Sequence, residues 1–310
     1  MRFTSIVVTV IGMLAGVPAV ASDGHRQHRP KTVYVFGDSL SDNGNANLLF
    51  PDLLCPFWCD APWAFPRYSN GPIWPDYMGI RLGKAIAPEV DGGTDYALGG
   101  ATISPDNPYN MAPAISGYAE VDTFLAQHAS ADPEAIYVVW LGPNDIDPPA
   151  SFTEHCFEQL VVMIQRLYDA GARVFLVPNL TDEGSLPVFR DIYCVGNTVY
   201  CDELNQMTAF WNDLLRQLPG RFPKARIRIS DYHWLMQMVT QFPALLGFKN
   251  STDPCWRDRT DGAMCSDPDD YWYFEYSHPT SRAQKVIADY FLLDMLIGGE
   301  LKITDLVAAR

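Results

Sequence analysis

The chain alternates short apolar runs with longer amphipathic stretches, and this alternation limits the folds that it can adopt. Short runs rich in β-branched and aromatic residues predict buried strands, whereas apolar residues three or four positions apart predict helices. Strands that alternate with helices imply parallel βαβ units and therefore a three-layer α/β domain. The predicted strands are residues 33–36, 96–98, 135–141, 173–177 and 226–229, and the predicted helices are residues 74–82, 117–128, 152–169, 203–218 and a last one that begins after Pro279.

The first predicted strand leads directly to a serine. Gly37 and Asp38 end the apolar run at residues 33–36, and Ser39 follows them in a predicted turn. In an open α/β sheet, ligands bind in the crevice beyond the carboxyl ends of the strands. Ser39 therefore stands where a nucleophile is useful, and it is the leading candidate for a catalytic residue.

The composition is that of a globular protein with a sizeable core. The 310 residues are 48% hydrophobic and 19% charged, which suits a single domain, predicted over residues 32–310. The formal net charge of −15 argues against nucleic acid as a partner, because the binding of phosphates needs clustered Lys and Arg.

The N-terminal segment has the pattern of a secretory signal peptide. Arg2 precedes an apolar core at residues 6–17, and a small-x-small cleavage site ends at Ala21. Residues 1–21 are therefore predicted to be a signal peptide, and the polar residues 22–31 a flexible leader. The apolar run is short for a retained membrane anchor, which needs about 20 residues. We expect a secreted or periplasmic protein.

The seven cysteines fit an oxidising compartment better than a metal site. Three pairs are close enough in sequence to close small loops, and Cys156 is left over. Other connectivities, including one that uses Cys156, remain open. The three predicted pairs are Cys55 with Cys59, Cys194 with Cys201, and Cys255 with Cys265.

Three stretches of unusual composition have more than one interpretation. The aromatic and proline-rich residues 48–71 form either a loop pinned by its own apolar cluster or a lip of the substrate pocket. Residues 233–248 are apolar on most faces, and this pattern is more typical of core than of a lipid-contacting flap. A lip or flap would allow transient contact with a membrane surface. The Asp-rich residues 251–270 predict a solvated loop, because their spacing fits no EF-hand.

Four short segments occur in an order that resembles the four blocks of the GDSL, or SGNH, hydrolases. They are GDSLSDNGN at residues 37–45, GGAT at 99–102, GPND at 142–145 and EYSHPT at 275–280. Two further stretches, RYSNGPIWPDYM and VPNLTDEGSLP, also look like this family. The resemblance spans nearly all of the chain after the predicted signal peptide. It implies a flavodoxin-like, five-stranded parallel sheet between helices, and hydrolysis of carboxylic esters through an acyl-serine intermediate.

The candidate nucleophile needs a base and a site for negative charge. Ser39 is a weak nucleophile until a neighbouring base accepts its proton. His278 is the candidate base, since Pro279 discourages helix at the histidine and lets its ring project from a loop. The resemblance implies three donors for the oxyanion of the tetrahedral intermediate: the backbone N–H groups of Ser39 and Gly100, and the side-chain amide of Asn144.

The chain departs from the family at the acid of the triad. The family usually has Asp three residues before the histidine, whereas this chain has Glu275. Glutamate can orient a catalytic imidazole, but its extra methylene demands a different loop position or rotamer. Glu275 is the predicted acid, and Asp269, Asp270 or a backbone carbonyl are the alternatives.

The signal peptide, the cysteine pairs and the aromatic insertion make the chain look like the secreted bacterial lipases, lysophospholipases and lipid acyltransferases of this family. We expect a monomer that cleaves a lipid ester and needs no metal or organic cofactor. One alternative is a small-ester esterase that acts on acetylated sugars or choline esters. The other is a binding protein that keeps the SGNH fold but has lost catalysis.

Overall fold

The computed structural model describes residues 31–258 and 260–306. The predicted signal peptide, residues 1–21, lies outside the described residues, as does the predicted leader, residues 22–31, apart from Lys31. Within the described ranges, no helix is long and apolar enough to cross a membrane.

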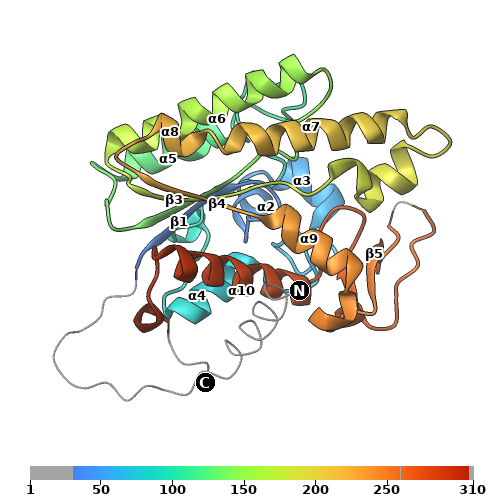
Figure 1. Ribbon diagram of the computed structural model, residues 1–310. Coiled ribbons are helices and arrows are strands. Elements are labelled where there is room, and N and C mark those ends of the chain that lie inside the picture. The colour runs from blue at the N-terminus through green and yellow to red at the C-terminus, as the bar shows by residue number, and fades with distance from the viewer. Residues whose placement is uncertain (1–30, 259, 307–310) are drawn as a thin grey trace.

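Four parallel strands form the central sheet (Figure 1). The first three have almost continuous apolar sequences because helices bury both of their faces. The fourth lies at an edge and alternates Arg with Ile. The order across the sheet is β1 (Val33–Gly37), β2 (Ile136–Trp140), β3 (Val174–Pro178) and β4 (Arg226–Ser230).

The sequence predicts five strands in the central sheet, and within the described residues this sheet has four. An extended segment at residues 94–98 takes the fifth place beside β1, where it forms only an isolated bridge. The side chain of Asp95 accepts a hydrogen bond from the N–H of Ala97 (3.0 Å), and such local bonds compete with a regular strand. The bonds to β1 run from the N–H of Val35 to the C=O of Thr94 (3.0 Å), from Tyr96 to Val35 (2.8 Å) and from Leu98 to Gly37 (3.0 Å).

Helices cover both faces of the sheet and confirm the three-layer α/β/α class (Figure 1). On one face α4 (Trp74–Leu82) packs against α10 (Ser281–Gly298). On the other face α6 (Ala150–Ala170) lies between α5 (Gly117–Gln127) and α7 (Val199–Leu215). These helices confirm the predicted ones, although α7 begins four residues earlier than the sequence pattern indicates. The remaining α-helices of the described residues are α2 (Asn45–Leu49), α3 (Pro51–Trp58), α8 (Leu218–Arg221) and α9 (Tyr232–Gln241).

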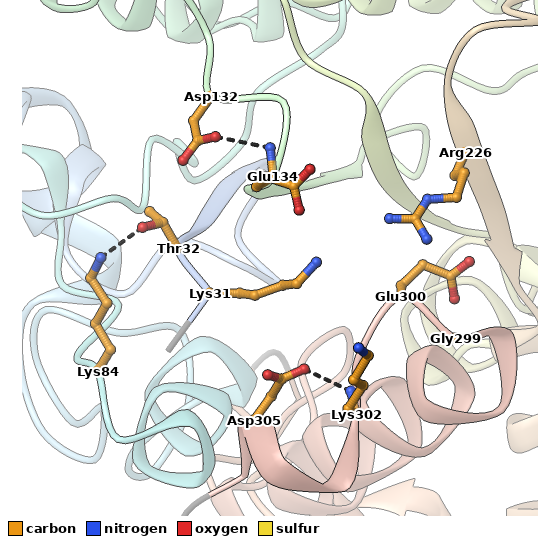
Figure 2. Close-up of a pocket in the computed structure, with 10 residues that line it drawn as sticks. All are labelled: Lys31, Thr32, Lys84, Asp132, Glu134, Arg226, Gly299, Glu300, Lys302 and Asp305. Atoms are coloured by element: carbon orange, nitrogen blue, oxygen red, sulfur yellow. Dashed lines mark hydrogen bonds between the residues drawn. The ribbon is translucent and has the colours of Figure 1, made fainter. Parts of the chain in front are cut away.

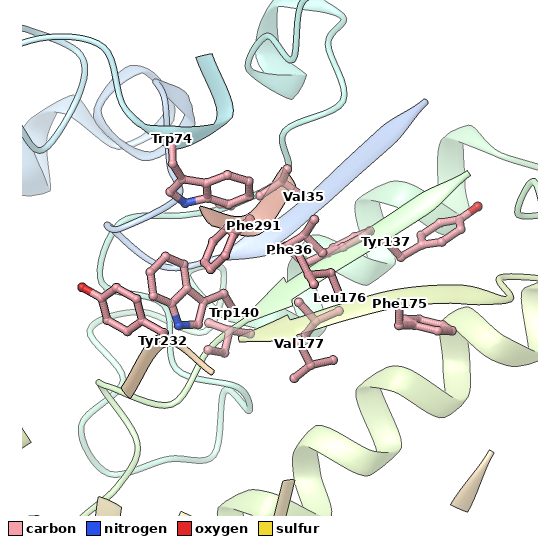
Figure 3. Packing of buried hydrophobic residues seen from close by; sticks show 14 of the residues in the cluster. Val35, Phe36, Trp74, Tyr137, Trp140, Phe175, Leu176, Val177, Tyr232 and Phe291 are labelled. Atoms are coloured by element: carbon pink, nitrogen blue, oxygen red, sulfur yellow. The ribbon is translucent and has the colours of Figure 1, made fainter. Parts of the chain in front are cut away.

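An aromatic cluster fixes helices against the end of β2 (Figure 3). The ring of Trp140 lies 5.3 Å from Phe291 of α10, 4.9 Å from Tyr232 of α9 and 6.3 Å from Trp74 of α4, measured between ring centroids. All four side chains are buried. Trp140 is also paired in register with Gly37, the last residue of β1. The cluster therefore supports the turn that follows β1.

Residues 48–71 contain a helix that their sequence does not indicate. α3 begins at Pro51, where proline is favoured, and continues through a second proline at position 56. The later part of the stretch packs away from solvent, because Trp63 and Tyr68 form an apolar cluster with Phe274. The stretch is thus anchored to a distant part of the chain as well as to itself.

The Asp-rich stretch is only partly a loop. The prediction is wrong at residues 251–254, which belong to β5 (Asn250–Pro254) and pair in parallel with β6 (Tyr271–Tyr273). This small ribbon escaped prediction because its exposed residues Thr252 and Asp253 break any apolar alternation.

Two further expectations, on residues 233–248 and on the cysteines, can be compared with the described residues. In α9 the side chains of Leu235, Met236 and Val239 are buried, so this part of residues 233–248 is core. All three predicted disulfides are present, and Cys156 is a buried free thiol.

Candidate active site

Ser39 lies in the turn after β1, beside an imidazole. Its Oγ is 2.7 Å from Nε2 of His278, and Nδ1 of His278 is 2.5 Å from Oε1 of Glu275. These distances allow a continuous chain of hydrogen bonds from the serine to the carboxylate. The structure therefore brings together the three residues that the sequence predicts as nucleophile, base and acid.

A tight loop between β6 and α10 holds the histidine and its carboxylate. Oε1 of Glu275 also accepts hydrogen bonds from the backbone N–H groups of Ser277 (2.9 Å) and His278 (2.7 Å). The N–H of Phe274 donates to the C=O of His278 (2.8 Å) and closes the loop. The longer side chain of glutamate is thus folded back onto its own loop, which accommodates the extra methylene.

The alternative acids lie elsewhere. The carboxylate of Asp270 pairs with Nζ of Lys249 (2.7 Å). In the part of the chain that the structure describes, neither Asp269 nor Asp270 forms a hydrogen bond to His278. Glu275 is the carboxylate that contacts the imidazole.

The aromatic insertion contributes a wall of the site. The ring of Tyr68 stacks on His278 with a centroid separation of 5.6 Å, and Trp63 meets the same imidazole edge-on at 5.9 Å. Trp58 and Tyr68 both line the cavity that contains Ser39. The stretch 48–71 is therefore both a pinned segment and a lip of the pocket.

The predicted oxyanion donors line the same cavity as Ser39. Gly100 has a φ of +80°, and a Cβ there would lie 2.1 Å from Cε of Met111, so the position favours glycine. Among the described residues, the backbone N–H groups of Ser39 and Gly100 have no hydrogen-bond acceptor. Nδ2 of Asn144 donates to the C=O of Ala101 (3.0 Å), which orients the amide and leaves its second N–H for another acceptor.

Asp42 connects the serine turn to the glycine turn, and sequence reasoning missed it. Its Oδ2 accepts hydrogen bonds from the N–H groups of Gly99 (2.8 Å) and Ala46 (3.0 Å). Its Oδ1 accepts from Gly44 (2.8 Å) and Asn45 (2.6 Å). The sequence DNGN at residues 42–45 is a signal for such a side-chain turn. The carboxylate of Asp42 thereby fixes the spacing between Ser39 and Gly100.

The cavity that contains Ser39 and His278 has a volume of about 340 Å³. Two other carboxyl groups, Asp38 and Glu183, line it, and no Lys or Arg does so among the described residues. Its remaining wall is rich in aromatic side chains, which include Tyr109, Trp140, Phe189, Tyr232 and Tyr273. In residues 31–258 and 260–306, no group of three or more His, Cys, Asp and Glu side chains is arranged to hold a metal ion.

A larger cavity, of about 760 Å³, lies away from the serine (Figure 2). It lies at the amino ends of the strands, because Thr32 precedes β1 and Arg226 begins β4. Cations such as Lys31 and Lys302 alternate there with acids such as Glu300. The cavity contains none of the predicted site residues.

Burial perturbs the carboxyl groups around the site. It raises the pKa of Asp38 and of Asp42 to about 6. It raises the pKa of Asp145, the residue after Asn144, and the pKa of Glu183 to about 8. Removal from water is the largest cause for each of these groups, since it penalises the charged form.

Comparison with known proteins identifies a family for this chain. Residues 33–291 match the protein family described as GDSL-like Lipase/Acylhydrolase. Lipase 1 of Photorhabdus luminescens is 32% identical over 186 residues, which are 57% of this chain but only 26% of that lipase. The GDSL esterase/lipase EXL5 of Arabidopsis thaliana is 25% identical over 327 residues and covers 85% of this chain and 90% of its own length. A solved Bacillus subtilis protein is 14% identical, with a TM-score of 0.42, over 87% of this chain and 57% of that chain.

The raised pKa values predict how stability depends on pH. Asp145 and Glu183 have a pKa of about 8 in the folded protein and of about 4 in the unfolded chain. Between about pH 4 and pH 8 the native state therefore binds more protons than the unfolded state. The stability that they contribute is therefore complete below about pH 4 and is lost as pH rises through 8. We expect the free energy of unfolding in urea to fall by about 2 kcal/mol or more from pH 6 to pH 9. The fall should be smaller in Glu183→Gln, and a rise in stability over this range would contradict the prediction.

Proposed function

Because the chain belongs to the GDSL-like lipase/acylhydrolase family and is a hydrolase of the esterase/lipase class, we propose that it cleaves carboxylic esters through an acyl intermediate on Ser39. The single observation that carries this mechanism is the hydrogen-bonded chain from Ser39 through His278 to Glu275. The same hydrogen-bonded chain favours a catalyst over a binding protein that has lost catalysis, because it places a base where it can accept the serine proton.

In the proposed reaction, Nε2 of His278 accepts the proton of Ser39 as Oγ attacks the ester carbonyl. The carbonyl oxygen becomes an oxyanion, which the N–H groups of Ser39 and Gly100 and the amide of Asn144 stabilise. His278 then gives its proton to the departing alcohol, and the acyl-serine remains. Water, activated by the same imidazole, releases the acid. Glu275 holds the imidazole in the productive tautomer and stabilises its charged form.

We propose a lipid-type ester as the substrate. Leu48, Leu49, Leu53 and Phe57 of α2 and α3 are exposed, with 41% to 68% of their surface accessible, and Trp58 of the same segment lines the cavity. This apolar surface would suit an acyl chain that extends beyond the cavity, or transient contact with a membrane surface. The protein would act after secretion or in the periplasm, and its three disulfides support an oxidising compartment.

A small-ester esterase is the second candidate, and the size of the cavity favours it. A volume of about 340 Å³ lies near the lower end of the range of roughly 300–1,000 Å³ that small-molecule sites occupy. An acetyl or butyryl ester would fit within the cavity, whereas a long acyl chain would have to leave it.

The proposed function is tested with p-nitrophenyl esters of two to sixteen carbons on the wild type and on Ser39→Ala. We expect the wild type to hydrolyse them and the variant to lose at least about 10³-fold in kcat, because no nucleophile remains. Long-chain turnover would support a lipid substrate, and turnover confined to acetyl and butyryl esters would favour the small-ester alternative. Equal hydrolysis by wild type and Ser39→Ala would overturn the mechanism.

Glu275→Gln tests the departure from the family's aspartate. Glutamine keeps a carbonyl oxygen for the two backbone N–H groups, but it has no charge to stabilise the imidazolium. We expect kcat to fall by about 10² to 10⁴ with little change in the thermal unfolding temperature. Retention of full activity would mean that Glu275 has no catalytic part.

Asn144→Ala tests the proposed oxyanion site. Removal of one donor typically costs about 3 kcal/mol of transition-state stabilisation, so we expect kcat to fall about a hundredfold or more while KM changes little. Asn110→Ala removes another loop amide, one that bonds Thr102 and Ile115 outside the cavity, and serves as the matched control. Near-normal turnover by Asn144→Ala would refute the assignment.

A further inference from the structure

Glu183 is a buried carboxyl group whose side chain has no hydrogen-bond partner among the described residues. It begins η2 (Glu183–Ser185), a short turn after β3, and its surface is 4% exposed. Its backbone N–H donates to Oγ1 of Thr208 (3.4 Å), but its side-chain oxygens form no hydrogen bond with any described residue. Burial without a partner is costly for a carboxyl group, and this group lines the cavity of Ser39 and His278.

The cavity is arranged for a positive charge. Asp38 adds a second carboxyl group to its wall, and no Lys or Arg from the described residues lines it. The cation nearest in sequence, Arg190, lies outside this cavity and is already bound by Asp191, Asp253 and the C=O of Thr252. A negatively charged group such as a phosphate would therefore meet carboxyl groups and find no cation to pair with.

Aromatic rings lie beside this carboxyl group. Tyr232 and Tyr273 both line the cavity and are close enough to Glu183 to interact with its charge. Trp140 lies 4.9 Å from Tyr232, measured between ring centroids. Aromatic faces attract ammonium groups, most strongly where water is excluded, and aromatic cages of this kind bind quaternary ammonium ligands.

The chain segment that carries Glu183 is hydrogen-bonded to the histidine loop. The N–H of Val188, in the segment that follows η2, donates to the C=O of Tyr276 in the histidine loop (3.0 Å). His278 of that loop delivers the proton to the leaving alcohol in the proposed reaction. The alcohol part of a bound ester would thus lie near the histidine loop, and Glu183 lines the same cavity as His278.

We propose that Glu183 is a specificity-determining residue that binds a positively charged ammonium group on the alcohol part of the ester. This inference rests on the proposed function and names the class of substrate, an ester of a cationic amino alcohol. The carboxylate and the rings of Tyr232 and Tyr273 would surround the ammonium group, while the acyl part reaches Ser39.

The test compares two esters that differ only in charge: butyrylcholine and 3,3-dimethylbutyl butyrate, in which carbon replaces the ammonium nitrogen. We expect the wild type to prefer the cationic ester by about tenfold or more in kcat/KM. In Glu183→Gln the two values should become similar, chiefly because KM for butyrylcholine rises. Glu154→Gln, an exposed acid on α6, is the matched control and should keep the wild-type preference. Thermal unfolding checks that each variant is folded.

A second measurement separates this inference from the proposed function. Tetramethylammonium should inhibit hydrolysis of the neutral ester competitively, with an inhibition constant about tenfold higher in Glu183→Gln. Ester hydrolysis without any preference for charge, or an unchanged preference in Glu183→Gln, would overturn the inference and leave the proposed function intact. If no ester is hydrolysed, the proposed function fails, and calorimetric binding of choline tests the cation site alone. Binding by the wild type that is lost in Glu183→Gln supports the site. No binding by the wild type overturns it.

Discussion

The parallel pairing of β1 to β4 is the constraint on which the site depends. The carboxyl ends of parallel strands lie on the same side of the sheet, so chain segments far apart in sequence meet there. Ser39 follows β1, Asn144 follows β2 and Glu183 follows β3. The histidine is the exception, because it comes from a loop outside the main sheet. Its position depends on β6 and α10, and on the aromatic contacts of Trp63 and Tyr68.

Much of this arrangement could be predicted from the sequence, because the buried parallel strands have continuous apolar runs that end in glycine and polar residues. The site residues Ser39, Asn144 and His278 stand in short motifs at the ends of these elements. Glu183 also stands in a family-like stretch, VPNLTDEGSLP, but that stretch does not indicate that this acid is buried at the cavity, and only the fold shows it. The polar strand β5 and the proline-containing helix α3 escaped prediction for the same kind of reason: tertiary contacts stabilise them, and local pattern does not.

The buried acids differ in how their charge is accommodated, and this difference separates structural groups from functional ones. Both oxygens of Asp42 accept backbone N–H groups, so its desolvation is compensated within the fold. Glu183 has no such compensation, and its pKa is raised to about 8. An ammonium group in the cavity would supply the missing partner and favour the carboxylate. The cost of burying Glu183 is then offset when substrate binds, as is common for groups that are held ready for a ligand.

The side chain of Glu275 and the backbone of the histidine loop stabilise each other. One oxygen of Glu275 accepts hydrogen bonds from the imidazole and from two backbone N–H groups of the same loop. An aspartate on this backbone would place its carboxylate one methylene short and could not reach all three donors. The exchange of Asp for Glu therefore needs a change of loop conformation with it, and the bond between Phe274 and His278 closes the loop in the form that suits glutamate.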